Sequence, residues 1–545
     1  MRIFVAQLNL IIGDFTYNVK KIFQAIAKGK KQKADIVLFS ELTLCGYPPE
    51  DLLFYPSFLE KMEEVMPKIC KASSDLMVVI GLARKNPEGK EKGAFNSAAV
   101  IIDGRLVGYK DKTLLPTYDV FDERRYFEPG KEQKIFEYKG KKIAILICED
   151  MWQHGGDLLF THYRRDPVKE LAENPPDLLL NLSASPYYFQ KRDTRVITFA
   201  ATAKTLKCPI VYCNQVGAND QLIFDGYSLY MSSKGELLQV AKGFVEDYLI
   251  IDTEQGLSPI AFEQDIYEDL FSALVLGVKD YFSKQGFKKA LLGLSGGIDS
   301  ALVACIAEKA LGKENITCLF LPTRYSSKES YEDSLLLVKN LEIKLLYLSI
   351  DTLFQSFLDT LAPHFSKNKP DITEENLQSR IRGIILMAFS NKFGSIVLST
   401  GNKSEMAMGY TTLYGDMCGG LGVLNDVSKA QVYQLARFIN RRRKVIPQTI
   451  LDKEPTAELK PGQRDIDTLP EYTTVDAVQE DYVEELLSAT DISKKRGLSL
   501  DLVQGLINKI HNAEYKRRQA PPGIRVTKRA FSKGRIFPIV QRWKH

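Results

Sequence analysis

Glycine, serine and aspartate crowd into one short segment of the chain, Gly-Leu-Ser-Gly-Gly-Ile-Asp-Ser, from Gly293 to Ser300. The apolar residues at its start predict a buried strand, and the pattern from about Ser300 to Lys309 predicts a helix. Backbone N–H groups of a glycine turn at a helix N-terminus form a phosphate-binding site. The segment lacks the lysine of a Walker A loop and the spacing of a dinucleotide fingerprint. We therefore expect a phosphate-binding turn in which Asp299 could bind magnesium; an ordinary glycine-rich turn is the alternative.

A cysteine follows another buried strand, which is predicted at residues 142–147. Cys148 stands beside two acidic residues, which a cysteine of the core would not need. A cysteine nucleophile requires a base and a donor to the oxyanion. Glu41 and Lys112, each near the end of a predicted strand, could supply these two groups. Nucleophilic chemistry at Cys148 is the hypothesis, and a buried structural cysteine is the alternative.

A second set of polar residues follows the strand predicted at residues 395–400. Thr400 ends this strand, and Glu405 comes shortly after it. Glu405 and Asp299 together could bind magnesium, because this metal favours carboxylates and phosphate oxygens. Lys429 adds an ammonium group for nucleotide phosphates. A solvated surface loop is the alternative for this region.

Asp371 is predicted to cap a helix, with Glu374 three residues later as the partner in a capping box. Asn376, Arg380 and Gly383 share one face of that helix. The face is either an exposed polar stripe or a wall that holds a nucleotide substrate.

The elements around these residues indicate two α/β domains. Strands predicted at residues 317–321, 344–348 and 395–400 alternate with helices, which is typical of a doubly wound parallel sheet. Ligands of such a sheet bind at the carboxyl ends of its strands. Residues 252–263 are poor in apolar side chains, so we place the domain boundary there. The basic segment 525–544 is expected to be a solvated tail.

The composition is that of a soluble globular protein, with 45% hydrophobic and 26% charged residues. A net charge of +5 over 545 residues argues only weakly for a polyanionic partner, so nucleic acid is not expected. Eight cysteines without a CxxC pair and five scattered histidines indicate a reducing compartment and no zinc site. The first residues predict a strand, and no apolar run could span a bilayer. We expect a cytoplasmic protein that does not contact a membrane.

Three segments of the first half resemble the motifs of the nitrilase superfamily, in the order and at the separations of that family: residues 39–42, 112–116 and 147–152. Residues 126–130 resemble a further segment of the family. The resemblance implies an α-β-β-α sandwich that hydrolyses amides or nitriles with a Glu-Lys-Cys triad. In that triad Cys148 would attack the carbonyl, Glu41 would move the proton and Lys112 would stabilise the oxyanion. Glu123 would be the auxiliary carboxylate of the family.

The second half resembles NAD+ synthetases, and its Ser-Gly-Gly-x-Asp-Ser turn resembles the pyrophosphate loop of ATP pyrophosphatases. Further segments that match in order are residues 454–459 and 467–470. Residues 177–186 and 210–226 resemble the amidase half of glutamine-dependent NAD+ synthetases, except that 218–221 read Ala-Asn-Asp-Gln where Gly-x-Asp-Glu is expected. This departure leaves a role for Gln221 open.

The resemblance to glutamine-dependent NAD+ synthetases implies a nitrilase-like amidase domain at residues 1–255 and a Rossmann-like ATP pyrophosphatase domain at 262–545. The implied reaction turns deamido-NAD+, ATP and glutamine into NAD+, AMP, pyrophosphate and glutamate, with magnesium as cofactor and a homo-oligomer as the assembly. The implied ATP-binding residues are Gly293, Leu294, Ser295, Gly296, Gly297, Ile298, Asp299, Ser300, Thr400 and Lys429. Those for deamido-NAD+ are Asn376, Glu405 and Lys516, and those for the metal are Asp299 and Glu405. For the glutamine head group, which needs a cation and hydroxyl donors, we expect Tyr118, Ser185 and Lys191.

Two other functions share part of this pattern. An RNA-modifying ATP pyrophosphatase would have the same loop and would use the basic tail on RNA, but it would not explain Glu41, Lys112 and Cys148. A stand-alone amidase with a regulatory nucleotide-binding domain would not need both Asp299 and Glu405. Salt-dependent affinity for tRNA would favour the first of these alternatives.

Overall fold

The computed structural model describes residues 1–87, 89, 92–155, 162–365, 368–464 and 470–543. It divides into two compact units, Met1–Asp269 and Leu270–His545. The segment noted above at 467–470 lies outside the described residues except for Pro470. No helix of the described ranges is long and apolar enough to cross a membrane.

The first unit contains two six-stranded sheets, with the strand orders β14-β1-β2-β3-β4-β5 and β13-β12-β9-β8-β7-β6, and the antiparallel pair β10-β11. The strands are β1 (Arg2–Gln7), β2 (Ile36–Leu38), β3 (Met77–Lys85), β4 (Ala94–Ile102), β5 (Arg105–Asp111), β6 (Ile135–Tyr138), β7 (Lys141–Ile147), β8 (Leu178–Ser183), β9 (Ile210–Asn214), β10 (Val216–Asn219), β11 (Leu222–Asp225), β12 (Leu229–Met231), β13 (Leu237–Val240) and β14 (Asp247–Asp252). The helices are α1 (Phe15–Lys31), α2 (Pro56–Ala72), α3 (Trp152–Gly155), α4 (Pro167–Ala172) and α5 (Lys191–Leu206), with the short 3-10 turns η1 (Glu50–Phe54), η2 (Glu123–Arg125) and η3 (Cys148–Met151).

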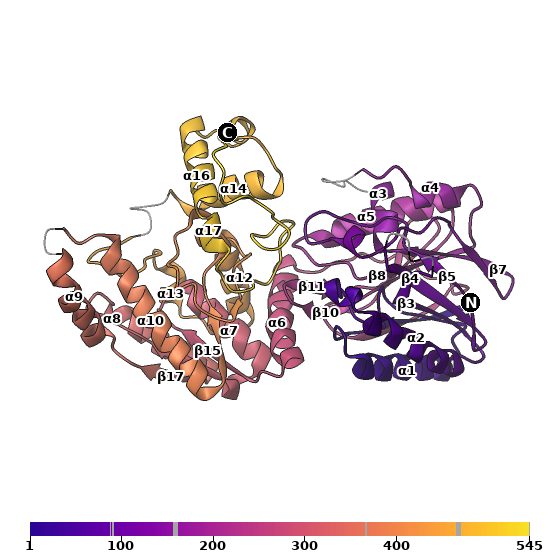
Figure 1. Cartoon of the computed structure of the whole chain (residues 1–545), viewed down its shortest axis with the longest axis horizontal. Coiled ribbons are helices and arrows are strands. Elements are labelled where there is room, and N and C mark those ends of the chain that lie inside the picture. The colour runs from indigo at the N-terminus through magenta and orange to yellow at the C-terminus, as the bar shows by residue number, and fades with distance from the viewer. Residues whose placement is uncertain (88, 90–91, 156–161, 366–367, 465–469, 544–545) are drawn as a thin grey trace. The chain divides into compact units, whose positions relative to one another are not determined.

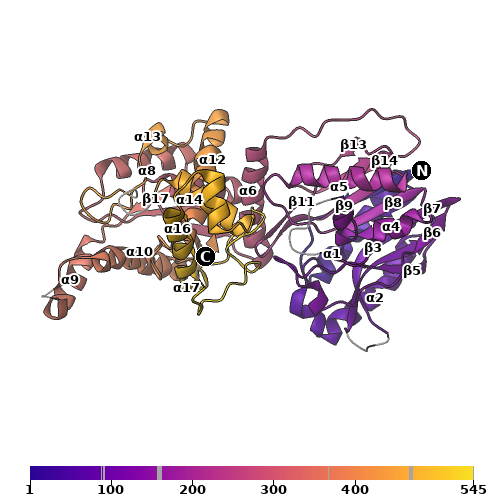
Figure 2. The same cartoon turned by 90° about the horizontal axis from the view of Figure 1, so that it is seen from above.

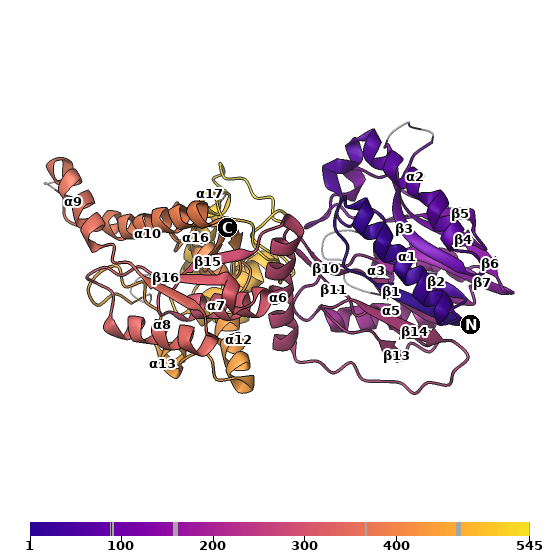
Figure 3. The same cartoon turned by 90° about the horizontal axis from the view of Figure 1, so that it is seen from below.

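The two sheets of this unit pack face to face and carry helices on their outer faces. Apolar residues that alternate along the strands, such as Ile3 and Val5 of β1 and Ile143 and Ile145 of β7, form one core between the sheets. A second core lies under α1 and α2, and a third lies under α4 and α5. Figures 1 and 3 show the resulting order of layers, helix–sheet–sheet–helix. The α-β-β-α sandwich expected for the first half is confirmed.

The second unit is built on a five-stranded sheet in which every neighbouring pair is parallel, in the order β17-β16-β15-β18-β19. The strands are β15 (Lys289–Gly293), β16 (Ile316–Phe320), β17 (Lys344–Tyr347), β18 (Ser395–Ser399) and β19 (Leu421–Gly422). The chain starts at β15 and moves outward first on one side and then on the other, so the switch point lies between β15 and β18. A crevice forms at such a point at the carboxyl ends of the strands. The doubly wound parallel sheet is confirmed.

Helices cover both faces of this sheet: α7 and α8 lie on one face and α10 on the other, as Figures 2 and 3 show from opposite sides. The helices are α6 (Ile266–Gln285), α7 (Ile298–Leu311), α8 (Lys328–Leu341), α9 (Asp351–Phe365), α10 (Ile372–Phe393), α11 (Lys403–Met408), α12 (Lys429–Arg442), α13 (Gln448–Asp452), α14 (Tyr472–Gln479), α15 (Ala489–Arg496), α16 (Leu500–Asn512) and α17 (Glu514–Arg517), with the short turns η4 (Lys313–Asn315) and η6 (Glu480–Glu484). The predicted capping box of α10 is present, since Asp371 accepts from Thr373 N and Glu374 accepts from Asp371 N.

The basic C-terminal segment is a solvated tail only in its second part: most of residues 536–543 are exposed, whereas several residues before them are buried. Arg525, Thr527 and Arg535 are buried, and Val526 is fully enclosed. Backbone pairing explains part of this burial. Gly422 of β19, at the edge of the sheet, donates to Pro522 O and accepts from Ile524 N, so that it forms a β-bridge with Gly523. Charge in a sequence does not predict exposure where the fold supplies partners for it.

Candidate active sites

Cys148 lies at a sharp turn directly after β7. Its φ of 40° is left-handed, a conformation that costs free energy for a residue with a Cβ and that recurs at functional sites. Asp150 holds this turn, because its carboxylate accepts from Ile147 N at 3.1 Å. The same carboxylate accepts from Thr113 N at 2.9 Å and from Leu114 N at 2.8 Å. Asp150 therefore fixes the turn of Cys148 against the segment that carries Lys112.

The Lys112 ammonium group lies between two carboxylates. Its Nζ is 2.7 Å from Glu41 Oε1 and 2.8 Å from Glu123 Oε1. Glu41 also accepts from Asn96 Nδ2 at 2.7 Å and from Ala184 N at 2.9 Å, so both of its oxygens are held. The side chains of Lys112 and Glu41 are at most 1% exposed. A buried ion pair of this kind is fully desolvated and rigidly placed.

Burial and charge set the protonation of this cluster. Burial raises the pKa of the Cys148 thiol, and the charge of Glu41 raises it further, while Lys112 opposes both. Burial alone would lower the pKa of Lys112, but Glu123 and Glu41 raise it well above its usual value. Burial raises the pKa of Glu123 to about 7, against the effect of Lys112. The thiol thus keeps its proton until a base beside it takes it, and Lys112 remains a cation.

Of the three residues expected to hold glutamine, Lys191 and Ser185 bond to each other and Tyr118 bonds to Glu149. Lys191 Nζ donates to Ser185 Oγ at 2.7 Å and to Pro186 O at 2.5 Å. Tyr118 instead donates its hydroxyl to Glu149, at 2.9 Å from Oε1. Electrostatics nevertheless connect them, because Tyr118, Lys191 and Glu149 each interact with Cys148 or with one another.

Sequence reasoning assigned no role to several side chains around Cys148. Glu149 is buried, its pKa is raised by burial, and it accepts from the hydroxyl groups of Tyr118 and Tyr163. The ring of Trp152 lies 5.0 Å from Lys191 Nζ. The sequence offers one signal for Glu149, which is its position next to Cys148 as one of the two acidic residues after this strand.

The glycine turn of the second unit has the backbone that a phosphate site needs. Gly296 has a φ of 78°, and a Cβ there would come within 2.5 Å of Ser330 O, so only glycine fits. The two serines point into the turn, with Ser295 Oγ and Ser300 Oγ 3.1 Å apart. Gly297 then caps the N-terminus of α7. This end of α7 leaves donors for an anion at the switch point of the sheet.

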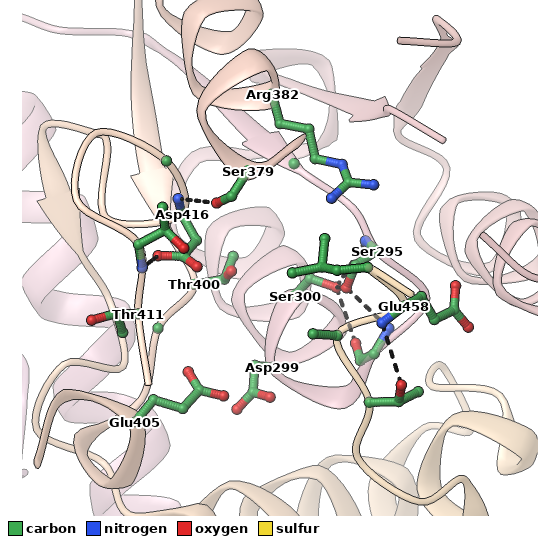
Figure 4. Close-up of a pocket in the computed structure, with 18 of the residues that line it drawn as sticks. Ser295, Asp299, Ser300, Ser379, Arg382, Thr400, Glu405, Thr411, Asp416 and Glu458 are labelled. Atoms are coloured by element: carbon green, nitrogen blue, oxygen red, sulfur yellow. Dashed lines mark hydrogen bonds between the residues drawn. The ribbon is translucent and has the colours of Figure 1, made fainter. Parts of the chain in front are cut away.

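Asp299 and Glu405 meet beside this turn with Lys429 between them. Asp299 Oδ2 is 2.5 Å from Lys429 Nζ, and Glu405 Oε1 is 3.9 Å from it. Asn402 Nδ2 donates to the other oxygen of Asp299 at 2.9 Å. Figure 4 shows the two carboxylates on the same side of the cavity. Burial and the charge of Asp299 raise the pKa of Glu405 to about 8, although Lys429 opposes this.

A cavity of about 370 Å³ lies at the carboxyl ends of β15 and β18. Its wall includes, from the residues expected at the ATP and deamido-NAD+ sites, Gly293, Leu294, Ser295, Gly297, Ile298, Asp299, Ser300, Asn376, Thr400, Glu405, Lys429 and Lys516. Within the described residues Gly296 is not part of this wall, because it packs against Ser330 instead. The segment at residues 454–459 also lines the cavity.

The predicted polar face of α10 is only partly in the cavity. Asn376 and Gly383 line the cavity, whereas Arg380 is not one of the lining residues within the described ranges. Arg380 Nε instead donates to Leu413 O at 3.2 Å. Arg382 takes that place, and burial lowers its pKa to about 10. On a helix with 3.6 residues per turn, residues 376, 379, 382 and 383 lie toward one side, and this side of α10 lines the cavity.

Two further charged groups enclose the cavity on the side of the C-terminal helices. Burial raises the pKa of Asp416 to about 6, and its carboxylate accepts from Thr412 N at 2.8 Å. Lys516 Nζ donates to Gly409 O at 2.8 Å and to Thr411 O at 2.7 Å. Burial lowers the pKa of Lys516, and Asp416 opposes the change. Arg382 and Asp416 had no motif of their own in the sequence.

Comparison with known proteins covers the whole chain. The family described as carbon-nitrogen hydrolase matches residues 2–258, and the family described as NAD synthase matches residues 270–520. A glutamine-dependent NAD(+) synthetase of Synechocystis sp. is 43% identical, over 98% of this chain and 98% of its own length. This chain belongs to the glutamine-dependent NAD+ synthetase family. The family member from Thermotoga maritima is 39% identical, over 100% of this chain and 99% of its own length.

Solved structures of the family agree with this assignment. The glutamine-dependent NAD+ synthetase of Acinetobacter baumannii, in complex with ADP, is 38% identical and superposes with a TM-score of 0.78 over 99% of this chain and 98% of its own. The fold is also that of the glutamine-dependent NAD+ synthetase of Cytophaga hutchinsonii, with a TM-score of 0.84 at 22% identity, over 99% of this chain and 98% of that one.

Proposed function

We propose that the two sites described above divide one reaction between them. The chain is a carbon–nitrogen ligase of the glutamine-dependent NAD+ synthetase family, which converts deamido-NAD+, ATP and glutamine to NAD+, AMP, pyrophosphate and glutamate. We assign glutamine hydrolysis to the domain predicted at residues 1–255 and amidation to that at 262–545.

In the first step Cys148 attacks the side-chain carbonyl of glutamine. Glu41 accepts the thiol proton, which suits an acceptor whose oxygens are already oriented by Asn96 and Ala184 N. Lys112, kept cationic by Glu123, stabilises the oxyanion. Glu41 returns its proton to the leaving nitrogen, so ammonia departs and a thioester remains. Water then hydrolyses the thioester to glutamate and restores the thiol.

Glutamine is held by its charged head group. Lys191 is the cation for the α-carboxylate, with Ser185 beside it as a hydroxyl donor. Tyr118 orients Glu149, whose carboxylate could take the α-ammonium group. Lys191 and Ser185, which bond to each other, then act on one side of the ligand, and Tyr118 acts through Glu149 on the other.

In the second step the nicotinate carboxylate of deamido-NAD+ attacks the α-phosphorus of ATP, and pyrophosphate leaves. The donors for the phosphates are the turn at Gly293–Ser300, Thr400 and Lys429. Asn376, Glu405 and Lys516 contact deamido-NAD+. Ammonia then displaces AMP from the adenylate and forms the amide. Activation is needed because a free carboxylate is a poor acceptor for an amine.

Asp299 and Glu405 are the residues that would hold magnesium. Two carboxylates at one cavity wall, one of them with a raised pKa, form a site short of positive charge. Within the described ranges no three Asp, Glu, His or Cys side chains cluster for a metal, so phosphate oxygens and water must complete the ligand set. Bound there, the ion would neutralise charge on the leaving pyrophosphate.

The observation that carries this proposal is the placement of the acidic pair at the glycine turn. The test is one assay on the full chain with ATP, deamido-NAD+ and glutamine. NAD+ and AMP should appear in equal amounts, and omission of deamido-NAD+ should stop AMP release. AMP release without NAD+ would contradict the proposal and favour a different nucleotide-dependent activity.

Location and assembly are further parts of the proposal. All eight cysteines are free, and catalysis needs Cys148 as a thiol, which supports a reducing, cytoplasmic location. A homo-oligomer is supported by the exposed apolar side chains of α9 and α10, which include Phe357 and Ile384. Light scattering of the purified chain tests the assembly.

A further inference from the structure

The helix that carries Glu405 is too short to be stable by itself. α11 contains six residues, whereas isolated helices in water need roughly 12–15. Its position therefore depends on groups outside it. Glu405 lies in its middle, so whatever holds α11 also holds a carboxylate of the nucleotide site.

The first residue of α11 is a fully buried lysine. Lys403 Nζ lies 2.6 Å from Thr527 Oγ1, 2.8 Å from Glu484 Oε1 and 3.0 Å from Asp426 Oδ1. It also donates to Arg529 O at 3.1 Å. Burial would lower the pKa of Lys403, but Asp426 and Glu484 raise it, so the group stays charged. We call Lys403, Asp426, Glu484 and Thr527 the Lys403 cluster.

Asp426 joins this cluster to the C-terminal segment. Its Oδ2 accepts from Val526 N and Thr527 N, both at 2.7 Å. Thr527 Oγ1 donates to Oδ1 at 2.8 Å. Asp426 is 2% exposed, so each of these bonds forms away from water. The C-terminal segment is fastened here by a charge-assisted set of bonds.

Asp426 also precedes Lys429, a cation of the nucleotide site, by three residues in the sequence. The backbone between Asp426 and α12 bonds to α11: Lys403 N donates to Val427 O at 2.9 Å, and Lys429 N donates to Ser404 Oγ at 2.9 Å. Lys429 then reaches Asp299 with its side chain. The Lys403 cluster is therefore connected through the backbone to both Glu405 and Lys429.

The other end of α11 is also held from the C-terminal region. Arg517 Nη1 donates to Met406 O at 3.0 Å and to Ala407 O at 3.3 Å, which satisfies carbonyls that a helix end leaves free. Glu514 orients Arg517 at 2.8 Å and also binds Arg535 at 2.9 Å. The segment from Pro521 to Arg535 thus contacts supports of α11 at both ends.

We infer that residues 521–535, which include the first part of the basic C-terminal segment, form a strap that positions Glu405 and Lys429 for adenylation. Asp426 and Thr527 are its positioning residues. This inference rests on the proposed function of Glu405 at the nucleotide site. Of the buried cations of the segment, Arg535 binds Glu514, which in turn orients Arg517 at the end of α11. Neither residue touches a substrate in this account, and both act through α11 and the turn before α12.

The test compares Thr527→Val, which removes the hydroxyl at constant volume, with Thr527→Ser, which keeps it. The assay is NAD+ formation by the full chain from ATP, deamido-NAD+ and saturating ammonia, titrated with magnesium. Thr527→Val should lower the rate about ten- to a hundredfold and raise the magnesium concentration for half-maximal rate, since a displacement of about 1 Å can cost that much. Thr527→Ser should restore most of both. Equal titrations for Val and Ser would overturn the inference.

Asp426→Asn should have the same effects, with Asp481→Asn as the matched control. Asp481 is as deeply buried and pairs with Lys495 and Arg496 at 2.6 Å. A purely structural role of Asp426 predicts that both variants lose melting temperature and that neither changes the magnesium titration, which would also overturn the inference. If Asp426→Asn does not fold, the Thr527 pair decides alone.

Asp299→Asn separates this inference from the proposal beneath it. A normal rate for Asp299→Asn would contradict the proposed function itself. Loss of rate in Asp299→Asn together with a parental Thr527→Val would refute the strap alone. Both losses together, with rescue by Thr527→Ser, are the expected result.

Discussion

The two sites of this chain handle charge in opposite ways. Beside Cys148 the Lys112 ammonium group is paired with Glu41 and Glu123, and the side chains of Glu41 and Lys112 are at most 1% exposed. Beside the glycine turn, Asp299 and Glu405 are 16% and 19% exposed at a cavity of about 370 Å³, and they share one ammonium group. The first site is complete without its substrate, and the second is short of positive charge until its ligands bind.

The difference follows from what each site must do. A thiol attack needs a fixed base and a fixed cation in a dry environment, where their charges act strongly. The proposed site for ATP must admit and release a bulky anion, so it cannot be filled by its own side chains. Loss of the Cys148 thiol should therefore abolish use of glutamine, whereas loss of either carboxylate of the second site should slow adenylation with either nitrogen source.

Cys148→Ala gives the largest expected effect. It should abolish NAD+ formation from glutamine and leave formation from ammonia intact, because the thiol serves only the first step. The measurement is NAD+ formation with each nitrogen source in turn. Cys208→Ala, at a buried cysteine of the core behind β9, is the matched control and should retain glutamine use. Glutamine-driven synthesis by Cys148→Ala at the parental rate would refute the triad.

Asp299→Asn and Glu405→Gln should act on the other site only. Loss of either carboxylate should slow pyrophosphate release by on the order of 10² or more with either nitrogen source, since these groups act mainly in the transition state. Glutamine hydrolysis by the full chain should continue. Glu342→Gln, a surface carboxylate paired with Lys313, is the control. Normal pyrophosphate release in both variants would return the second domain to a regulatory role.

Lys191→Ala should have a smaller effect confined to binding. Removal of the cation for the glutamine carboxylate should raise the KM for glutamine about tenfold or more, with little change in ammonia-driven synthesis. Lys204→Ala, an exposed lysine on the same helix, controls for loss of charge on α5. An unchanged KM for glutamine in Lys191→Ala would remove this residue from the head-group site.

Both the fold and much of the candidate sites could be predicted because their signals are local. Strand-terminal Glu41 and Cys148, and the glycine turn at Gly296, are marked by short patterns whose geometry follows from neighbouring residues. The partners of these groups are not local. Asn96 and Ala184 reach Glu41 across 55 and 143 residues of chain, and no periodicity in the sequence reports such contacts.

The errors have the same origin. The basic segment at residues 525–544 is expected in solvent, and most of residues 536–543 are exposed, but Asp426 binds the backbone of Val526 in its buried first part from 100 residues away. On α10 the pattern places Asn376, Arg380 and Gly383 on one face; Asn376 and Gly383 line the cavity, and Arg382, which the pattern did not single out, lines it with them. Composition and periodicity describe a segment, but burial of a charge depends on partners that only the folded chain assembles.

The smallest expected effect concerns Glu123 and stability. Its pKa is raised to about 7 by burial, and its Oε2 is a buried atom without a hydrogen-bond partner in the structure. A carboxyl group whose pKa is higher in the folded than in the unfolded state costs nothing below pH of about 4.5 and destabilises increasingly up to pH of about 7, by a few kcal/mol at most. Glu123→Gln cannot titrate and keeps an acceptor for Lys112 and Tyr47. The melting temperature of Glu123→Gln should therefore rise relative to that of the parent between pH 5 and pH 8. The measurement is calorimetry of the transition in which the first unit, Met1–Asp269, unfolds. Parallel pH profiles of the two proteins would mean that Glu123 is ionised throughout this range. Glu41, Glu123 and Lys112 would then carry a net negative charge, and the charges beside Cys148 would not be balanced within the protein.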